Sequence, residues 1–270
     1  DAKAIEGLMT QFAPLSEGLI DPDAVPAEPK EVYVKPGDIW LCGKHRVMCG
    51  DSEKQADVLR LMAGTTAIGQ IYDPEWDKTF AIPLTTERLV FCDGGCVGEA
   101  VTLHGSPRWL FAWDCVTSWY AKGRPLRRMK IALWYGKTPY DADGWHYGEA
   151  GEAHEVTNTR GSYHYVPDPR GKHLSDVFVR SLVREHADGP SHSKPVDWVT
   201  LLIANCLPKA GSIHDPFLGS GTTLIACERL ERTCYGMEVE PNNAQIAIER
   251  WQNFTGQKAV REPSPSAGQP

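Results

Sequence analysis

The sequence lacks a long apolar run. No stretch approaches the ~20 apolar residues that a helix needs to cross a bilayer. The first residues carry acids where a signal peptide has a basic segment and an apolar core. We therefore expect a cytoplasmic protein without a membrane-spanning helix. The chain begins at Asp1 rather than Met, and we expect it to be a processed or excised fragment with a further domain upstream.

The chain also lacks an excess of positive charge. Its 28 Lys and Arg residues are outnumbered by 35 Asp and Glu residues, which gives a formal charge of -7. This balance argues against a protein that coats nucleic acid. It does not exclude a local basic groove, because the distribution of charge matters more than the sum.

The eight cysteines follow no pattern typical of disulfides or of zinc. Cys92 and Cys96 have a C-x3-C spacing, and Cys42, His45 and Cys49 lie close together, but a second matching pair is missing. Other cysteines lie inside apolar runs such as IANCLP and LIACERL. We expect reduced, buried thiols and no metal site.

The chain divides into three parts by composition. Residues 1–30 combine a short helical pattern with a linker rich in Pro and acids, and residues 263–270 are typical of a disordered tail. Residues 31–262 alternate strand and helix patterns, which predicts an α/β fold with a mostly parallel sheet. Within them, residues 138–192 are polar and weakly periodic, and such a long segment is usually functional or mobile.

Local patterns place the elements of the 31–262 domain. Strands are predicted within 37–51 (a hairpin), 66–74, 87–95, 107–116, 129–137, 211–215 and 232–241, and helices within 53–64, 196–207, 222–230 and 242–256. In the first helix, Val58, Leu59 and Met62 are expected to share the buried face, with Gly64 ending the helix.

The most informative stretch is DPFLGSGTT, residues 215–223. Gly219 and Gly221 allow a sharp turn and let a ligand approach the backbone. The third glycine of the dinucleotide pattern and the P-loop lysine are both missing, which excludes a triphosphate cradle. Glu238 lies 19 residues after Gly219, at the end of the next strand, where an acid can bind two ribose hydroxyls. Together these features predict a site for an adenosine-type ligand.

Three segments carry a family resemblance. Residues 215–241 closely resemble the cofactor motif of S-adenosylmethionine-dependent DNA amino-methyltransferases, which methylate N6 of adenine or N4 of cytosine. Residues 192–212 and 37–52 resemble two further segments of that family. The catalytic motif precedes the cofactor motif, which is the order of the β group. The resemblance implies a Rossmann-like fold with a mostly parallel, seven-stranded sheet and helices on both faces.

The resemblance also implies cofactor contacts. The glycine turn with Phe217 would wrap the methionine part of S-adenosylmethionine, and Glu238 would hold its ribose. Asp51 and Ser52 would lie near the adenine, and the Lys-Pro pair would lie beside the methionine end. The full set of candidates is Asp51, Ser52, Lys194, Pro195, Asp215, Phe217, Gly219, Ser220, Gly221, Thr222 and Glu238. The family's His-Pro-Thr-x-Lys-Pro is incomplete, because this chain reads Pro-Ser-His-Ser-Lys-Pro.

The family's catalytic Asp-Pro-Pro-Tyr corresponds to Asp73-Pro74-Glu75-Trp76. An exocyclic amine is a poor nucleophile because its lone pair is delocalised into the ring. Asp73 and the carbonyl of Pro74 can accept hydrogen bonds from its two hydrogens, which aims the lone pair at the methyl group. Trp76 can stack on the base for ~1–3 kcal/mol, which offsets part of the cost of flipping it out of a duplex. In the family, a catalytic loop that begins with Asp favours N6 of adenine as the methylated atom.

Glu75 departs from the family pattern and leaves alternatives open. Three alternatives are open. Glu75 points to solvent and is tolerated, or it contacts the target amine or an unusual substrate, or it marks a weakened or inactive enzyme. The alternatives to a DNA adenine enzyme are therefore a degenerate module that binds the cofactor or DNA, and an enzyme that acts on N4 of cytosine, on RNA or on a modified base.

A basic run between two predicted strands is the candidate DNA contact. It contains Lys122, Arg124, Arg127, Arg128 and Lys130, and aromatic residues flank it. Phosphate contacts supply much of the affinity for DNA, and aromatics can stack on bases. The alternative is a solvated loop between core strands. In the family the 138–192 region carries target recognition, which makes Arg160, Tyr163, His164 and Arg170 further candidates, and a homodimer is a possible assembly.

Overall fold

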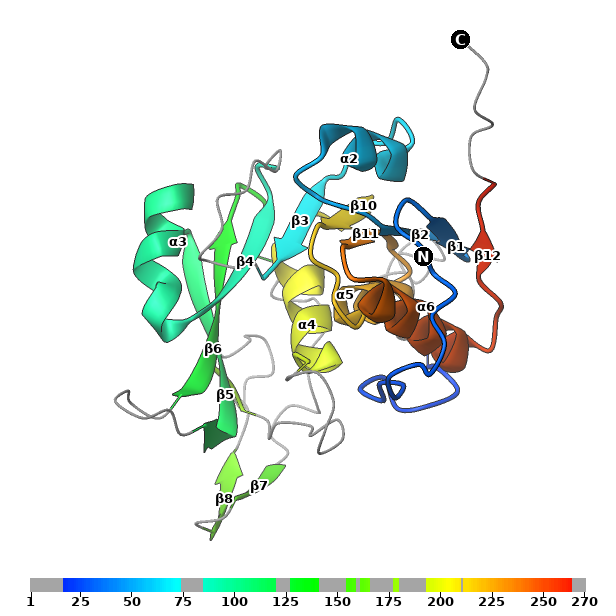
Figure 1. Cartoon of the computed structure of the whole chain (residues 1–270). Helices are drawn as coiled ribbons and strands as arrows, with labels where there is room; N and C mark the ends of the chain where they lie inside the picture. Colours follow the sequence, from blue (N-terminus) through cyan, green and yellow to red (C-terminus); the bar gives the residue numbers. More distant parts are fainter. Residues whose placement is uncertain are drawn as a thin grey trace, which may run out of the picture.

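The computed structural model describes residues 17–73, 85–119, 127–140, 154–158, 161–165, 177–179, 193–209 and 211–263. The helix expected near the start and most of the expected tail lie outside these ranges. Within them, no helix is long and apolar enough to span a membrane. The described elements form one large twisted sheet with helices on both faces, and a separate two-stranded ribbon (Figure 1).

The large sheet has ten strands in the described part of the chain, in the order β12-β1-β2-β11-β10-β3-β4-β6-β5-β9. Its strands are β1 (Ile39–Cys42), β2 (His45–Cys49), β3 (Gly69–Tyr72), β4 (Arg88–Asp93), β5 (Trp109–Trp119), β6 (Arg127–Tyr135), β9 (Val177–Val179), β10 (Ser212–Asp215), β11 (Thr233–Glu238) and β12 (Val260–Arg261). The ribbon pairs β7 (His154–Asn158) with β8 (Gly161–Tyr165).

The five central strands, from β2 to β4, pair in parallel. β1 and β12 extend one side with antiparallel pairs, and the antiparallel β6 and β5 extend the other. The α/β fold class is confirmed. The sheet is wider than the expected seven strands, because short strands such as β9 and β12 continue its two edges.

Helices cover both faces of this sheet (Figure 1). They are α2 (Gln55–Met62), α3 (Val97–His104), α4 (Val196–Cys206), α5 (Thr222–Arg229) and α6 (Pro241–Thr255), and a 3-10 turn η1 (Gly94–Cys96) precedes α3. Side chains alternate along β4, so that Leu89 and Phe91 join the core under α4, α5 and α6, while Val90 and Cys92 join the core under α3. Apolar side chains on both faces therefore fix the central strands inside the sheet.

The predicted hairpin, strands and four helices all appear, with shifted ends. The predicted buried face of α2 was wrong at Leu59, whose exposed fraction is 63%, whereas Leu61 is fully buried. The buried set Val58, Leu61 and Met62 follows the i, i+3, i+4 spacing of one helix face. The short helix α3 and the strands β7, β8, β9 and β12 were not predicted, because their patterns are short and interrupted by polar residues.

A carboxylate ties the N-terminal hairpin to two helices. Glu228 Oε2 on α5 lies 2.7 Å from His45 Nε2 on β2 and 2.7 Å from Trp251 Nε1 on α6. The backbone N–H of Cys234 donates to His45 Nδ1, so the neutral ring donates its Nε2–H to the carboxylate. Burial lowers the pKa of His45, and its bond to Glu228 only partly opposes this.

Replacing Glu228 by Ala should lower the free energy of unfolding by about 2–3 kcal/mol, because it leaves the buried His45 and Trp251 donors without an acceptor. Urea unfolding followed by far-UV circular dichroism measures this difference. The matched control is Glu99→Ala, an exposed acid on α3, which should change the value by less than about 0.5 kcal/mol. Equal effects of the two substitutions would show that the buried contact contributes nothing specific.

Candidate functional site

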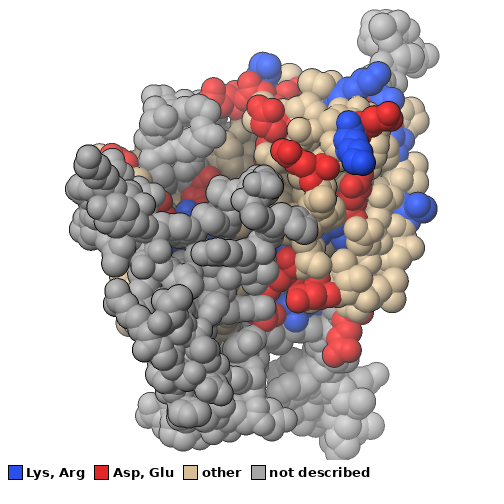
Figure 2. Space-filling view, turned by 60° about the horizontal axis from the view of Figure 1, so that its bottom comes forward, with Lys and Arg blue, Asp and Glu red and all other residues tan. Residues whose placement is uncertain are grey.

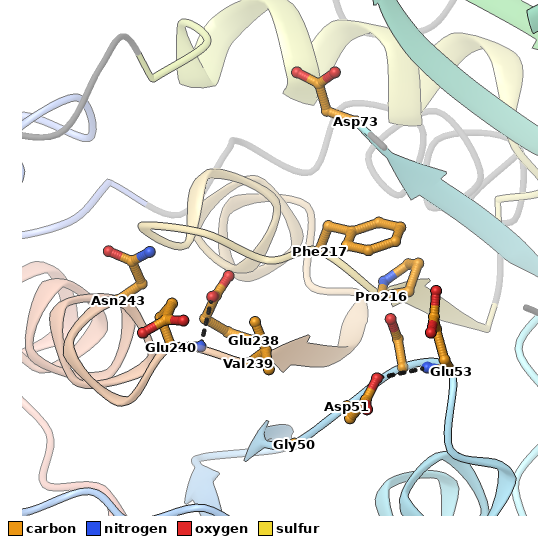
Figure 3. Close-up of a pocket in the computed structure, with 11 residues that line it drawn as sticks. Gly50, Asp51, Glu53, Asp73, Pro216, Phe217, Glu238, Val239, Glu240 and Asn243 are labelled. Atoms are coloured by element: carbon orange, nitrogen blue, oxygen red, sulfur yellow. Dashed lines mark hydrogen bonds between the residues drawn. The ribbon is translucent and has the colours of Figure 1, made fainter. Parts of the chain in front are cut away.

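A crevice lies where parallel strands end side by side. β10 and β3 are neighbours in the sheet, but the chain continues from β10 to β11 on one side and from β3 to β4 on the other. Because the two connections diverge in this way, a crevice opens at the carboxyl ends of β10 and β3. A pocket of about 460 Å³ is found there (Figure 3), lined by Gly50, Asp51, Ser52, Glu53, Asp73, Pro216, Phe217, Glu238, Val239, Glu240 and Asn243.

The glycine turn connects β10 to α5 beside this pocket, and the two residues that precede it most closely in the lining are Pro216 and Phe217. Gly219 and Gly221 have backbone φ angles of 56° and 87°, which residues other than glycine rarely adopt. A Cβ at Gly221 would also lie 3.0 Å from the Cβ of Ala247 on α6. The turn is fixed to the neighbouring strand, because the Leu218 N–H donates to the Met237 carbonyl at 2.8 Å. Glycine is therefore needed at position 219 for conformation, and at position 221 for both conformation and space.

Glu238 ends β11 beside this turn, as predicted from its spacing. The backbone N–H of Gly219 donates to its Oε2 at 2.9 Å, and the N–H of Glu240 donates to its Oε1 at 2.9 Å. Burial raises the pKa of Glu238, although these two hydrogen bonds and one from the Asn243 side chain oppose the rise. A carboxylate has about four acceptor positions, so this one is held in place and keeps acceptor capacity for a ligand hydroxyl.

Asp51 and Ser52 lie on the opposite wall, in the turn that follows β2. The N–H of Glu53 donates to Asp51 Oδ1 at 3.0 Å, and Lys54 Nζ lies 3.4 Å from Asp51 Oδ2. Ser52 is buried against the pocket. Figure 3 shows Phe217 between this wall and Asp73, which lies on the far side of the pocket. The structure therefore brings these predicted residues together around one cavity.

Asp73 follows β3 directly and is paired with two lysines. Its Oδ2 lies 2.9 Å from Lys194 Nζ and 3.2 Å from Lys130 Nζ. Burial raises the pKa of this carboxyl, but the two ammonium groups outweigh it and lower the pKa to about 2. Asp73 is therefore ionised at neutral pH, with a hydrogen-bond acceptor at the edge of the pocket.

Lys130 and Lys194 had different predicted roles. Lys130 was expected at DNA and Lys194 beside the methionine end of a cofactor. The structure places the ammonium groups of both on Asp73, with Lys130 also 3.2 Å from Asp93 Oδ1. The Lys194 ammonium also lies over the Phe91 ring, 4.8 Å from its centroid. Lys194 and Lys130 are therefore part of the environment of the candidate catalytic carboxylate.

Ser220 and Thr222 of the turn contact residues of other segments. Ser220 Oγ lies 2.9 Å from Ser193 Oγ, just before the Lys194-Pro195 pair that begins α4. Arg250 was missed at the sequence level. Its guanidinium donates to the Ser220 carbonyl at 3.2 Å and lies 3.4 Å from Thr222 Oγ1, and its side chain is buried. No local pattern distinguishes this arginine from an exposed one on an amphipathic helix.

Asp215 supports the turn rather than the pocket. Its Oδ1 accepts the Phe217 N–H at 3.0 Å, which closes the first bend after β10. Burial raises the pKa of Asp215 to about 6, although hydrogen bonds from Thr223 and Phe217 oppose the rise. Asp215 is not among the residues that line the pocket.

The pocket has an acidic lining. Its described lining residues include no Lys or Arg, and its five carboxylates are Asp51, Glu53, Asp73, Glu238 and Glu240. Figure 2 shows acidic side chains over the middle of the described surface on the face that it presents, and basic ones mainly along one edge. A pocket of this charge suits a cationic ligand.

Several predicted site residues lie outside the described structure. They are Pro74, Glu75, Trp76, Lys122, Arg124, Arg160 and Arg170. Arg127 and Arg128 begin β6, and Tyr163 and His164 belong to β8, but the described structure gives only the backbone of these four residues. Their roles remain predictions.

A parallel α/β sheet with a glycine turn after one strand and an acid at the end of the next is typical of the Rossmann-like class of folds. Comparison with known families identifies the branch, because the family model described as DNA methylase, for N6 and N4 methyltransferases, matches residues 107–249. The match covers more than half of the chain, which therefore belongs to this family.

Curated relatives match shorter stretches. The type II methyltransferase M.BglII of Bacillus subtilis is 26% identical over 151 residues, which cover 53% of this chain and 41% of the relative. The type II methyltransferase M.SmaI of Serratia marcescens is 48% identical over 40 residues, which cover 15% of this chain and 14% of the relative. The chain thus spans about two fifths or less of the length of these two relatives.

Solved structures share the fold at low identity. The M1.HpyAVI–SAM complex has a TM-score of 0.51 and 17% identity, and covers 76% of this chain and 98% of its own. PvuII DNA methyltransferase, described as cytosine-N4-specific, has a TM-score of 0.50 and 12% identity, with 82% and 90% covered. These likenesses confirm the Rossmann-like methyltransferase fold.

Proposed function

We propose that this protein is a DNA methyltransferase that moves a methyl group from S-adenosylmethionine to an exocyclic amine of a base, with N6 of adenine as the target. The observation that carries the proposal is the position of Asp73. It lines the same pocket as Glu238 and as Phe217, which leads into the glycine turn. A candidate catalytic acceptor and a candidate nucleoside site thus share one cavity.

The pocket residues fit the cofactor by their chemistry. Glu238 retains acceptor capacity for the ribose hydroxyls, and the turn at Gly219 lets the methionine part approach the backbone. Asp51 and Ser52 would lie along the adenine. S-adenosylmethionine, when bound, supplies a methyl group activated by its positively charged sulfur. An acidic pocket favours that charge, and the M1.HpyAVI structure, which contains SAM, has the same fold.

The proposed chemistry of the chain begins with the target amine. The Asp73 carboxylate and the Pro74 carbonyl accept its two N–H bonds, which turns the nitrogen lone pair toward the methyl carbon. The new nitrogen–carbon bond forms as the carbon–sulfur bond breaks. The alkylated amine is then strongly acidic, because loss of a proton restores its conjugation with the ring. The Asp73 carboxylate, or solvent through it, accepts that proton.

The choice of N6 of adenine rests on the Asp form of the catalytic loop. N4 of cytosine offers the same two hydrogens and remains the second candidate. The family model covers both reactions. The type II methyltransferase relatives support a place in restriction–modification. We further propose that the 138–192 region, which includes the β7–β8 ribbon, reads the DNA sequence, together with Lys122, Arg124, Arg127 and Arg128 before and at the start of β6.

Incubation with methyl-labelled S-adenosylmethionine and separate DNA, RNA and free-base acceptors tests the proposed function. We expect label to enter DNA. Intact binding of the cofactor without transfer to any acceptor would replace the enzyme by a binding module. Transfer to RNA alone would replace the substrate but not the chemistry.

Trp76 provides a further test of the flipped base. Trp76→Ala should slow transfer to DNA by about 10- to 100-fold, because the base loses a stacking contact of ~1–3 kcal/mol. Trp76→Tyr is the matched variant, since it restores the aromatic residue of the family pattern and should retain most of the rate. Single-turnover kinetics at saturating cofactor measure both. An Ala variant as fast as the Tyr variant would remove stacking from the mechanism.

A further inference from the structure

Lys130 connects two acids at the ends of neighbouring strands. It lies opposite Asp93 in the antiparallel pairing of β4 with β6. Its Nζ is 3.2 Å from Asp93 Oδ1 and 3.2 Å from Asp73 Oδ2. Its side chain is 19% exposed, so the ammonium group lies largely within the protein. An ion pair of this kind is less screened than one on the surface.

Both lysines contact the same oxygen of Asp73. Lys194 approaches Oδ2 at 2.9 Å from the start of α4, and Lys130 approaches it from β6. The contact given for each lysine is to Oδ2, and so is the hydrogen bond that Lys130 donates. Two ammonium groups on one oxygen restrict the rotation of the carboxylate. They also leave the other oxygen as the acceptor for a ligand.

We propose that Lys130, braced by Asp93, is a positioning residue that holds Asp73 Oδ2 and thereby presents Oδ1 to the target amine. The inference rests on the proposed function and adds a residue to it. Lys194, which lies just before α4, holds the same oxygen. The two lysines and two aspartates are formally neutral together, so this cluster adds no net charge beside the cationic cofactor.

The geometry argues against the DNA-contact role expected for Lys130. A phosphate contact needs a cation that is exposed and not already neutralised. Two carboxylates already surround Lys130, and burial limits its access to a DNA backbone. Burial alone would lower the pKa of Lys130, but Asp73 and Asp93 outweigh it and raise the pKa. The lysine therefore stays charged and paired across the physiological range.

Charged and titratable groups around Asp73 define the pH response. They are Lys194, Lys130, Asp93 and the Cys92 thiol, whose pKa burial raises to about 12, with a further rise from the Asp73 charge. The thiol is therefore neutral, and the two lysines are the groups that keep the pKa of Asp73 at about 2. Its active, ionised form is present above that pKa and is lost as the pH falls through it.

Lys130→Met tests the positioning role. The variant should lower kcat by about 10- to 100-fold, since a small misplacement of a catalytic group has an effect of this size. KM for S-adenosylmethionine should change little. The acid limb of the kcat–pH profile should move to higher pH, because Asp73 loses one of its two cations. Lys130→Arg keeps the charge and should recover part of kcat and most of the original profile.

Asp93→Asn separates positioning from DNA contact. If Lys130 orients Asp73 through its pair with Asp93, this variant should also lower kcat. A lysine that binds phosphate would instead gain freedom, and Asp93→Asn would leave kcat unchanged or tighten DNA binding. Lys137→Met is the control, because this exposed lysine follows the same strand and contacts neither acid. An unmethylated DNA long enough to contain most short recognition sequences serves as substrate.

The inference is overturned if Lys130→Met weakens DNA binding and its salt dependence while leaving kcat and the pH profile at saturating DNA unchanged. The carboxyl carbon signal of Asp73, assigned with Asp73→Asn and followed by NMR over the pH range in which the proteins stay folded, needs no substrate. It should titrate at higher pH in Lys130→Met than in the wild type. Titration at the same pH in both proteins would also overturn the inference. If instead the titration differs as expected but the wild type transfers no methyl group, only the proposed function is overturned.

Discussion

Replacing Asp73 by Ala should lower the rate of methyl transfer to DNA by about 10²- to 10³-fold, the range seen when one preorganised hydrogen-bonding group is removed from a transition state. The carboxylate has a defined position here, because Lys194 and Lys130 hold its Oδ2 at 2.9 and 3.2 Å. The Ala variant loses the acceptor that aims the amine. It also leaves two unpaired ammonium groups next to a cofactor that is itself cationic.

Two comparisons make this result specific to Asp73. Asp73→Asn keeps one oxygen acceptor, for which the two lysines and the target amine compete, so its rate should fall between those of the wild type and of Asp73→Ala. Glu99→Ala removes an exposed acid on α3 outside the pocket and should leave the rate unchanged. Single-turnover kinetics measure the effect on the rate of transfer, and calorimetry separately measures the effect on cofactor binding. A full rate in Asp73→Ala would exclude this residue from catalysis.

Glu238→Gln should weaken binding of S-adenosylmethionine by about 1.5–3 kcal/mol, or roughly 10- to 150-fold in Kd, because the ribose loses hydrogen bonds to a charged acceptor. The amide also has an NH2 group where the Gly219 and Glu240 N–H groups now find carboxylate oxygens. One of those N–H groups would therefore face a donor. Calorimetric titration with the cofactor gives the change in Kd directly.

Glu53→Gln is the matched control for Glu238, because it removes the same charge from the opposite wall of the same pocket. A specific ribose contact at Glu238 predicts a much smaller change in Kd for Glu53→Gln. Equal losses for both variants would mean that the acidic pocket attracts the cationic ligand only through its overall charge. Circular dichroism should show both variants folded at the temperature of the titration.

The arrangement of the glycine turn and Glu238 was predictable from the sequence because its signals are local. Gly219 and Gly221 have the positive φ angles that only glycine adopts readily, and the spacing to Glu238 follows from one helix between two adjacent parallel strands. The support by Arg250 from α6 was not predictable, because it depends on the packing of two helices. The number of strands was missed for a related reason: short edge strands are defined by their partners more than by their own residues.

The environment of Asp73 could not be predicted from the sequence. Lys130 belongs to a run of five basic residues, and composition alone does not distinguish a buried lysine from the exposed basic residues in such a run. Alternation along β6 was the available signal, since Lys130 has the same parity as Ala132 and Trp134, whose side chains join the core under α4. Its approach to Asp73, 57 residues away, depends on the pairing of β4 with both β3 and β6. That sheet order is set by long-range contacts.

The central claim is methyl transfer to an exocyclic amine of DNA, and nucleoside mass spectrometry tests it most directly. Unmethylated DNA is incubated with the protein and S-adenosylmethionine carrying an isotopically labelled methyl group, then digested to nucleosides and separated. The account predicts labelled N6-methyldeoxyadenosine, which is lost in Asp73→Ala. Label on a ring carbon, or no labelled nucleoside from a protein that binds the cofactor, would contradict it.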